Sequence, residues 1–165
     1  MQPNWIKQRA YLTPNRVALS FNNQEWTFNE LYLQSVRLAY KLNTLQLTNG
    51  KRVAVLAPST PALVELLYAC MQAQCEVVLL NSRLAKQELT YQIEDAEVDT
   101  ILVADEELAK LPDDARIMPF SQLYETHESD YDIATQWDED FALTIMYTSG
   151  TTGFPKGVCQ TVSNH

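Results

Sequence analysis

Two short apolar runs separated by one helical segment constrain the fold of this chain more than any other feature. Residues 52–57 (RVAVLA) and residues 76–80 (EVVLL) are almost continuously apolar, which is typical of parallel strands covered on both faces. Between them, residues 58–61 (PSTP) predict the start of a helix, with Ser59 or Thr60 as N-cap. Strand, helix and strand in this order predict a right-handed βαβ unit.

The segments around this unit extend it into a doubly wound α/β fold, with a mostly parallel sheet, flanking helices and an N-terminal β-hairpin. The hairpin is predicted to turn at two asparagines, which tolerate the positive φ of a two-residue turn. Thr27 and Glu30 form a capping-box signature that predicts the start of an amphipathic helix. The predicted elements are helices over residues 5–12, 28–42 and 84–93, strands over 100–104 and 116–119, and the hairpin over 17–28.

Composition limits the class of protein. The chain has 165 residues, of which 46% are hydrophobic, and this suits one globular core. The net charge is −9 and no run of lysine or arginine occurs, so nucleic acids and anionic membranes are excluded as expected partners. No apolar stretch approaches 18 residues and the N-terminus lacks a signal-peptide core. We therefore expect a cytoplasmic protein without an integral membrane segment; its oligomeric state stays open.

Residues 121–140 interrupt the hydrophobic pattern and carry many irregularly spaced carboxylates. This pattern predicts an acidic surface linker, with solvated carboxylates and no metal site. The chain has three cysteines, Cys70, Cys75 and Cys159, all on apolar segments. An odd number of cysteines in such surroundings predicts buried, reduced thiols, and their spacing does not favour a zinc site.

The segment 147–158 (YTSGTTGFPKGV) holds three of the four glycines of the chain together with several hydroxyl side chains and Lys156. Glycine permits positive φ, so backbone N–H groups can turn toward one point, and hydroxyls and a lysine add donors for an oxyanion. Residues 141–147 and 158–162 are strand-like and are expected to hold both ends of this loop. The spacing does not match a Walker A loop, because Pro155 stands where the second glycine is required.

This segment resembles the phosphate-loop signature of the acyl-adenylating (AMP-binding) enzymes, and all twelve positions match. The resemblance covers nearly the whole chain, and the ending QTVSNH (160–165) is similar to that of the o-succinylbenzoate–CoA ligases of menaquinone synthesis. Two positions depart from the family pattern: Val162 stands where many relatives have histidine, and Ala85 stands where a capping threonine is frequent. Further matching stretches are residues 11–18, 26–31, 53–56, 81–84, 88–89 and 93–96.

The resemblance implies an ATP-dependent ligase that joins a small-molecule carboxylate to coenzyme A through an acyl-AMP intermediate, with ATP and Mg²⁺ as cofactors and coenzyme A as cosubstrate. It implies that residues 1–165 are the N-terminal portion of the adenylate-forming domain, that the C-terminal domain is absent, and that this portion alone is inactive. It assigns no catalytic residue to this chain, and His165 is a candidate for the acyl or adenylate pocket. Another acyl- or aryl-CoA synthetase, or a truncated non-catalytic binding fragment, remains the alternative. The ATP phosphate-binding residues implied are Thr148, Ser149, Gly150, Thr151, Thr152, Gly153 and Lys156.

Overall fold

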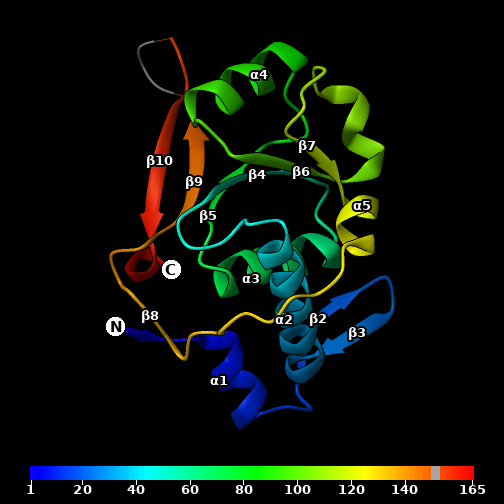
Figure 1. Ribbon diagram of the computed structural model, residues 1–165, viewed down its shortest axis with the longest axis vertical. Helices are drawn as coiled ribbons and strands as arrows, with labels where there is room; N and C mark the ends of the chain where they lie inside the picture. Colours follow the sequence, from blue (N-terminus) through cyan, green and yellow to red (C-terminus); the bar gives the residue numbers. More distant parts are fainter. Residues whose placement is uncertain (150–152) are drawn as a thin grey trace.

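A six-stranded mixed sheet forms the centre of the protein in a computed structural model that describes residues 1–149 and 153–165 (Figure 1). Its strand order is β10-β9-β5-β4-β6-β7, and all neighbouring strands are parallel except β9 and β10. The predicted doubly wound, mostly parallel α/β sheet is therefore confirmed. The strands are β4 (Arg52–Leu56), β5 (Glu76–Leu79), β6 (Thr100–Val103), β7 (Ile117–Pro119), β9 (Ala142–Thr148) and β10 (Lys156–Thr161).

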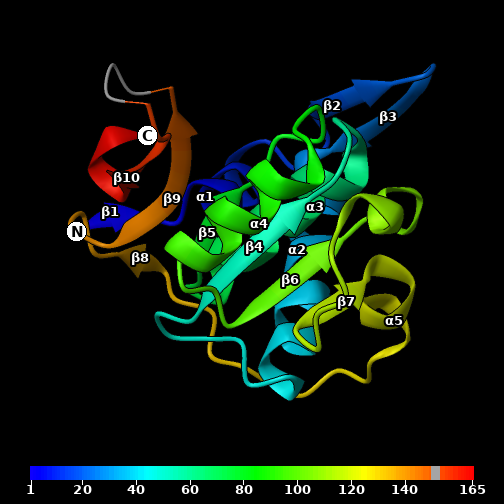
Figure 2. The ribbon, with the colours of Figure 1, turned by 90° about the horizontal axis from the view of Figure 1, so that it is seen from above.

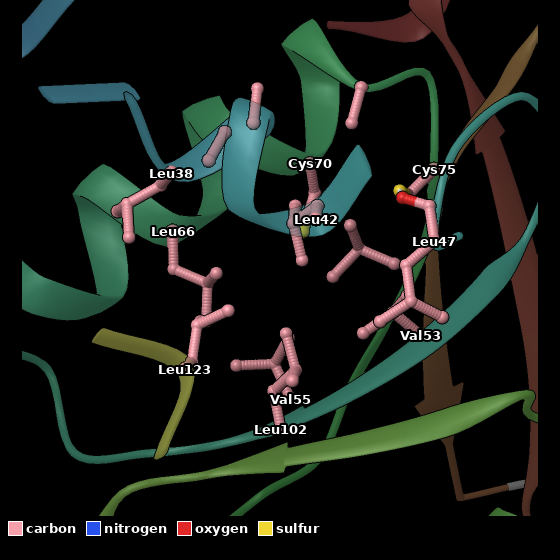
Figure 3. Packing of buried hydrophobic residues seen from close by; sticks show 14 of the residues in the cluster. Leu38, Leu42, Leu47, Val53, Val55, Leu66, Cys70, Cys75, Leu102 and Leu123 are labelled. Atoms are coloured by element: carbon pink, nitrogen blue, oxygen red, sulfur yellow. Dashed lines mark hydrogen bonds between the residues drawn. The ribbon is translucent and has the colours of Figure 1, made fainter. Parts of the chain in front are cut away.

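Helices cover both faces of this sheet (Figures 1 and 2). Helices α2 (Phe28–Thr44), α3 (Pro61–Gln72) and α5 (Phe120–Glu125) lie on one face, and α4 (Lys86–Asp95) lies on the other. The central strand β4 supplies side chains to both cores: Val53 and Val55 pack with the α2 and α3 side chains, whereas Ala54 and Leu56 pack with those of α4. Figure 3 shows the first of these cores, in which Leu42, Leu66 and Leu102 are fully buried.

The N-terminal helix, hairpin and capping box agree with the sequence-based predictions. Helix α1 (Trp5–Leu12) precedes the hairpin of β2 (Val17–Phe21) and β3 (Gln24–Thr27). Asn22 and Asn23 have φ values of 50° and 62°, as the predicted turn requires. The capping box is also present, because the Glu30 backbone N–H donates to Thr27 Oγ1 over 3.2 Å and the Glu30 carboxylate accepts from the Thr27 N–H over 2.8 Å.

Two helix starts test the capping predictions. Helix α4 begins at Lys86, two residues later than predicted, because the Asn81 side chain accepts a hydrogen bond from the Arg83 N–H and holds a turn there. Ala85 is its N-cap and offers no side-chain acceptor. Helix α3 starts as predicted, with Thr60 as N-cap and Pro61 in the first turn, although the Thr60 side chain makes no capping hydrogen bond.

Residues 121–140, predicted to be a surface linker, contain regular secondary structure. They include the end of α5 and strand β8 (Gln136–Trp137), which pairs with β1 (Gln2–Pro3). Leu123 and Trp137 are apolar residues within the acidic run, and they are 1% and 4% exposed. Leu123 packs in the core under α2 and α3, and Trp137 packs with Leu143 and Val162 in a separate small cluster. A 3₁₀ turn at Asp105–Lys110 was likewise not predicted. In the described part of the chain, no helix has the length and apolar character needed to cross a bilayer.

The three cysteines differ in their surroundings. Cys70 and Cys75 are buried as predicted, and the Cys75 thiol contacts the Leu47 carbonyl oxygen at 3.0 Å (Figure 3). A hydrogen bond with the Cys70 thiol, and then burial, raise the pKa of Cys75 well above its ordinary value. The prediction for Cys159 is wrong: this residue is exposed, because β10 is the edge strand of the sheet.

Thiol labelling distinguishes these environments. In the folded protein, we expect one thiol, Cys159, to react rapidly with a disulfide reagent, and all three to react after denaturation. The reaction is followed by absorbance, and Cys159→Ser is the control that removes the rapid phase. Rapid labelling of Cys70 or Cys75 in the folded protein would contradict this packing.

Candidate functional site

The predicted phosphate loop connects β9 to β10 at the carboxyl end of β9. The two strands are antiparallel, and Lys156 lies opposite Thr148 in their register. Thr148, Ser149 and Lys156 are all exposed at this end of the pair, so the register sets two residues with hydroxyl groups beside one lysine. The other predicted members Gly150, Thr151 and Thr152 lie outside the described residues.

Glycine suits the two described glycine positions of the motif for different structural reasons. Gly153 has φ +100°, a conformation that residues with a Cβ rarely adopt, and among the described residues no atom lies within 4 Å of the position of a Cβ. Gly157 instead lies under the ring of Tyr147: a Cβ there would be 3.2 Å from Ile145 Cγ2 and 3.3 Å from Tyr147 Cζ. Glycine at this position leaves room for the Tyr147 ring to lie across β10.

Helix α4 contacts both flanks of the loop. The Tyr147 hydroxyl donates to Asp95 Oδ2 over 2.7 Å, and the Tyr91 hydroxyl donates to the Pro155 carbonyl over 3.3 Å. The rings of Tyr91 and Phe154 lie 5.5 Å apart between centroids and are inclined by 35°. Sequence reasoning missed these contacts; the available signal was the four-residue spacing of Tyr91 and Asp95, which places them on one helical face.

Burial and the hydrogen bond to Asp95 raise the pKa of Tyr147 above its ordinary value. Both effects favour the neutral phenol, because ionisation would put a second negative charge beside the Asp95 carboxylate. The Tyr147 hydroxyl is therefore a donor throughout the physiological pH range and holds β9 to α4.

A cleft of about 430 Å³ opens beside the same strand, between α3 and the β5–β9 part of the sheet. Its walls are mainly apolar, and His165 lies at its edge with Nε2 3.0 Å from Thr144 Oγ1. Thr144 and Met146 line the cleft, Thr148 ends the same strand, and Ser149 follows it in the loop. The cleft is lined by Trp5, Val64, Leu67, Tyr68, Met71, Val77, Leu79, Leu143, Thr144, Met146 and His165.

The chemistry of the loop suits an anion. Its described donors are hydroxyls and an ammonium group, which match phosphate oxygens. Within residues 1–149 and 153–165, no group of three or more histidine, cysteine, aspartate or glutamate side chains is arranged to hold a metal ion.

A family model described as "AMP-binding enzyme" matches residues 6–165. Among curated proteins, the chain is 41% identical to a 2-succinylbenzoate–CoA ligase of Bacillus velezensis and 40% identical to one of Geobacillus kaustophilus, with 99% of this chain covered in both cases. These alignments cover 34% and 33% of the two relatives. The chain thus spans about a third of the length of the curated relatives it matches.

Solved structures similar to this chain include those of an o-succinylbenzoate CoA synthetase. The chain superposes on o-succinylbenzoate CoA synthetase from Bacillus subtilis, bound to a product analogue, with a TM-score of 0.89 and 34% identity. That match covers 99% of this chain and 34% of the other. The same enzyme in complex with ATP and magnesium ion matches with a TM-score of 0.86 and 33% identity, over 97% of this chain and 43% of the other.

The raised pKa of Tyr147 predicts a pH dependence of stability. An unfolded tyrosine ionises near pH 10, whereas the folded state resists this ionisation. The contribution of Tyr147 to the free energy of unfolding is therefore complete below about pH 10 and is lost as the pH rises further.

We expect Tyr147→Phe to lose less stability than the wild type between pH 9.5 and 11 in urea titrations. The control Tyr11→Phe, on a ring that is 86% exposed, should follow the wild type; identical pH profiles for all three proteins would contradict the assignment.

Proposed function

Because the chain belongs to the family of AMP-binding enzymes, we propose that its β9–β10 loop binds the phosphates of ATP in an AMP-forming ligase that joins o-succinylbenzoate to coenzyme A. Residues 1–165 are then the N-terminal portion of the adenylate-forming domain. The observation that carries this proposal is the register of β9 and β10, which sets Lys156 opposite Thr148 beside the exposed Ser149.

ATP enters this site as a substrate together with its Mg²⁺. Thr148 and Ser149 supply rotatable hydroxyl donors, and Gly153 allows a backbone conformation in which N–H groups turn inward. Lys156 offers a mobile positive charge to the β- and γ-phosphate oxygens and balances the charge of the leaving pyrophosphate. Gly150, Thr151 and Thr152 belong to the same proposed site on the strength of the sequence motif.

The cleft beside β9 is the proposed site of the acid. Its apolar walls suit an aromatic ring, and Thr144 and His165 provide polar groups at one edge. The cleft and the loop share β9, so an acid bound in the cleft lies near a nucleotide held by the loop. Such positioning of two reactants supplies much of the rate enhancement in reactions of this type. The relatives named as 2-succinylbenzoate–CoA ligases support this acid as the substrate.

The substrate assignment is tested with the intact enzyme that carries these 165 residues. We expect it to release pyrophosphate and form a CoA thioester with o-succinylbenzoate, and to use benzoate and medium-chain fatty acids far less well. Pyrophosphate release and thioester formation are measured in parallel for each acid. No turnover of o-succinylbenzoate, with turnover of another acid, would contradict the substrate but keep the ligase.

Lys156 is the residue whose loss tests the phosphate site. Hydrogen bonds to charged groups contribute about 1.5–3 kcal/mol, so Lys156→Ala should lower kcat/KM for ATP by about 10- to 100-fold. The control is Lys51→Ala, which removes the same charge at the opposite end of the parallel strands. Equal ATP kinetics for both variants would show that Lys156 does not contact the phosphates.

A further inference from the structure

We propose that Tyr91 and Asp95 of α4 are positioning residues that hold the two flanks of the β9–β10 loop and thereby determine how tightly it binds ATP. Each acts through a flank of the loop: Asp95 through Tyr147 and Tyr91 through Pro155. This role rests on the ATP-binding function proposed above, although the restraint itself can be measured without nucleotide.

The two residues hold opposite flanks of the loop from successive turns of one helix. Asp95 accepts the hydrogen bond of Tyr147, which precedes Thr148 directly. Tyr91 donates to the carbonyl of Pro155, which precedes Lys156 directly. Because residues four apart lie on the same helical face, α4 fixes the spacing between the strand end that carries the hydroxyls and the one that carries the ammonium group.

Phe154 contacts α4 although it is largely exposed. Its side chain is 70% exposed, yet its ring lies against that of Tyr91 with centroids 5.5 Å apart. Aromatic pairs at this distance stabilise beyond the area that they bury. The contact therefore restrains the chain immediately after Gly153.

A hollow lies between α4 and the described residues at the end of the loop. It has a volume of about 330 Å³ and is lined by Gln87, Glu88 and Tyr91 from the helix and by Gly153, Phe154 and Pro155 from the loop. The Glu88 carboxylate is already engaged at the start of α4, where it accepts from the Ala85 N–H over 2.8 Å. On the Pro155 side of the hollow the loop is thus held by the contacts of Tyr91. On the other side, the Tyr147 ring packs against the cluster that contains Leu89 and Ile93 of α4, and its hydroxyl is held by Asp95.

Holding the flanks matters because an anion site made of backbone and hydroxyl donors must be ordered before it binds well. A loop that is already ordered loses less conformational entropy when the ligand arrives. Loss of one contact should therefore weaken ATP binding while the acid cleft on the other face of the sheet is unaffected. A merely structural role would instead raise KM for both substrates together.

The first test measures KM for ATP and for the acid in the intact enzyme. A lost hydrogen bond corresponds to about a threefold to tenfold change, so Asp95→Ala and Tyr91→Ala should each raise KM for ATP by this factor and leave KM for the acid within about twofold. Tyr91→Phe retains the ring contact with Phe154 and should show a smaller effect. Tyr147→Phe combined with Asp95→Ala should be no worse than either alone, since both remove one interaction. Tyr11→Ala is the control.

The second test uses trypsin cleavage after Lys156 in the protein without nucleotide. Asp95→Ala and Tyr91→Ala should accelerate this cleavage about threefold or more, while each lowers the melting temperature by only about 2–4 °C, as the loss of one hydrogen bond does. Faster cleavage supports the restraint even if the wild type proves not to use ATP, in which case only the proposed function fails. Unchanged cleavage and unchanged KM for ATP would overturn the inference, as would an equal rise in KM for both substrates.

Discussion

The parallel pairing of β9 with β5 is the constraint on which the candidate site depends. β5 is buried between two layers of helices, and its register sets Val77, Val78 and Leu79 beside Thr144, Ile145 and Met146 of β9. This pairing fixes where β9 ends, and its end is where the hydroxyl residues stand. In open α/β sheets, ligands bind beyond the carboxyl ends of the parallel strands, which is where the β9–β10 loop lies.

A second set of contacts ties this edge of the sheet to α4. Gly157 lacks a Cβ, so the Tyr147 ring can lie across β10, and its hydroxyl then reaches Asp95. A glycine of the motif thus serves the packing beside the loop. The same strand also carries Thr144 at the edge of the cleft. One strand therefore couples the core, the loop and the cleft.

Much of this fold could be predicted from the sequence, because the signals are local. The apolar run of β4, the asparagine turn and the capping box of Thr27 and Glu30 each depend on neighbouring residues. Contacts between distant segments left no such signal. The exposure of Cys159 follows from the edge position of β10, which its apolar composition does not reveal. The start of α4 was misplaced because the Asn81 turn delays it.

The candidate site, like the fold, was predictable where its signal is local and was not where it depends on contacts between distant segments. The motif located the loop, but the placement of Lys156 opposite Thr148 and of His165 beside Thr144 required the strand register and the tertiary fold. The central claim is tested most directly by a crystal structure of the intact enzyme with ATP and Mg²⁺. We predict phosphate oxygens about 3 Å from the hydroxyls of Thr148 or Ser149 and from Lys156 Nζ. A triphosphate bound elsewhere, with these side chains in water, would contradict the account.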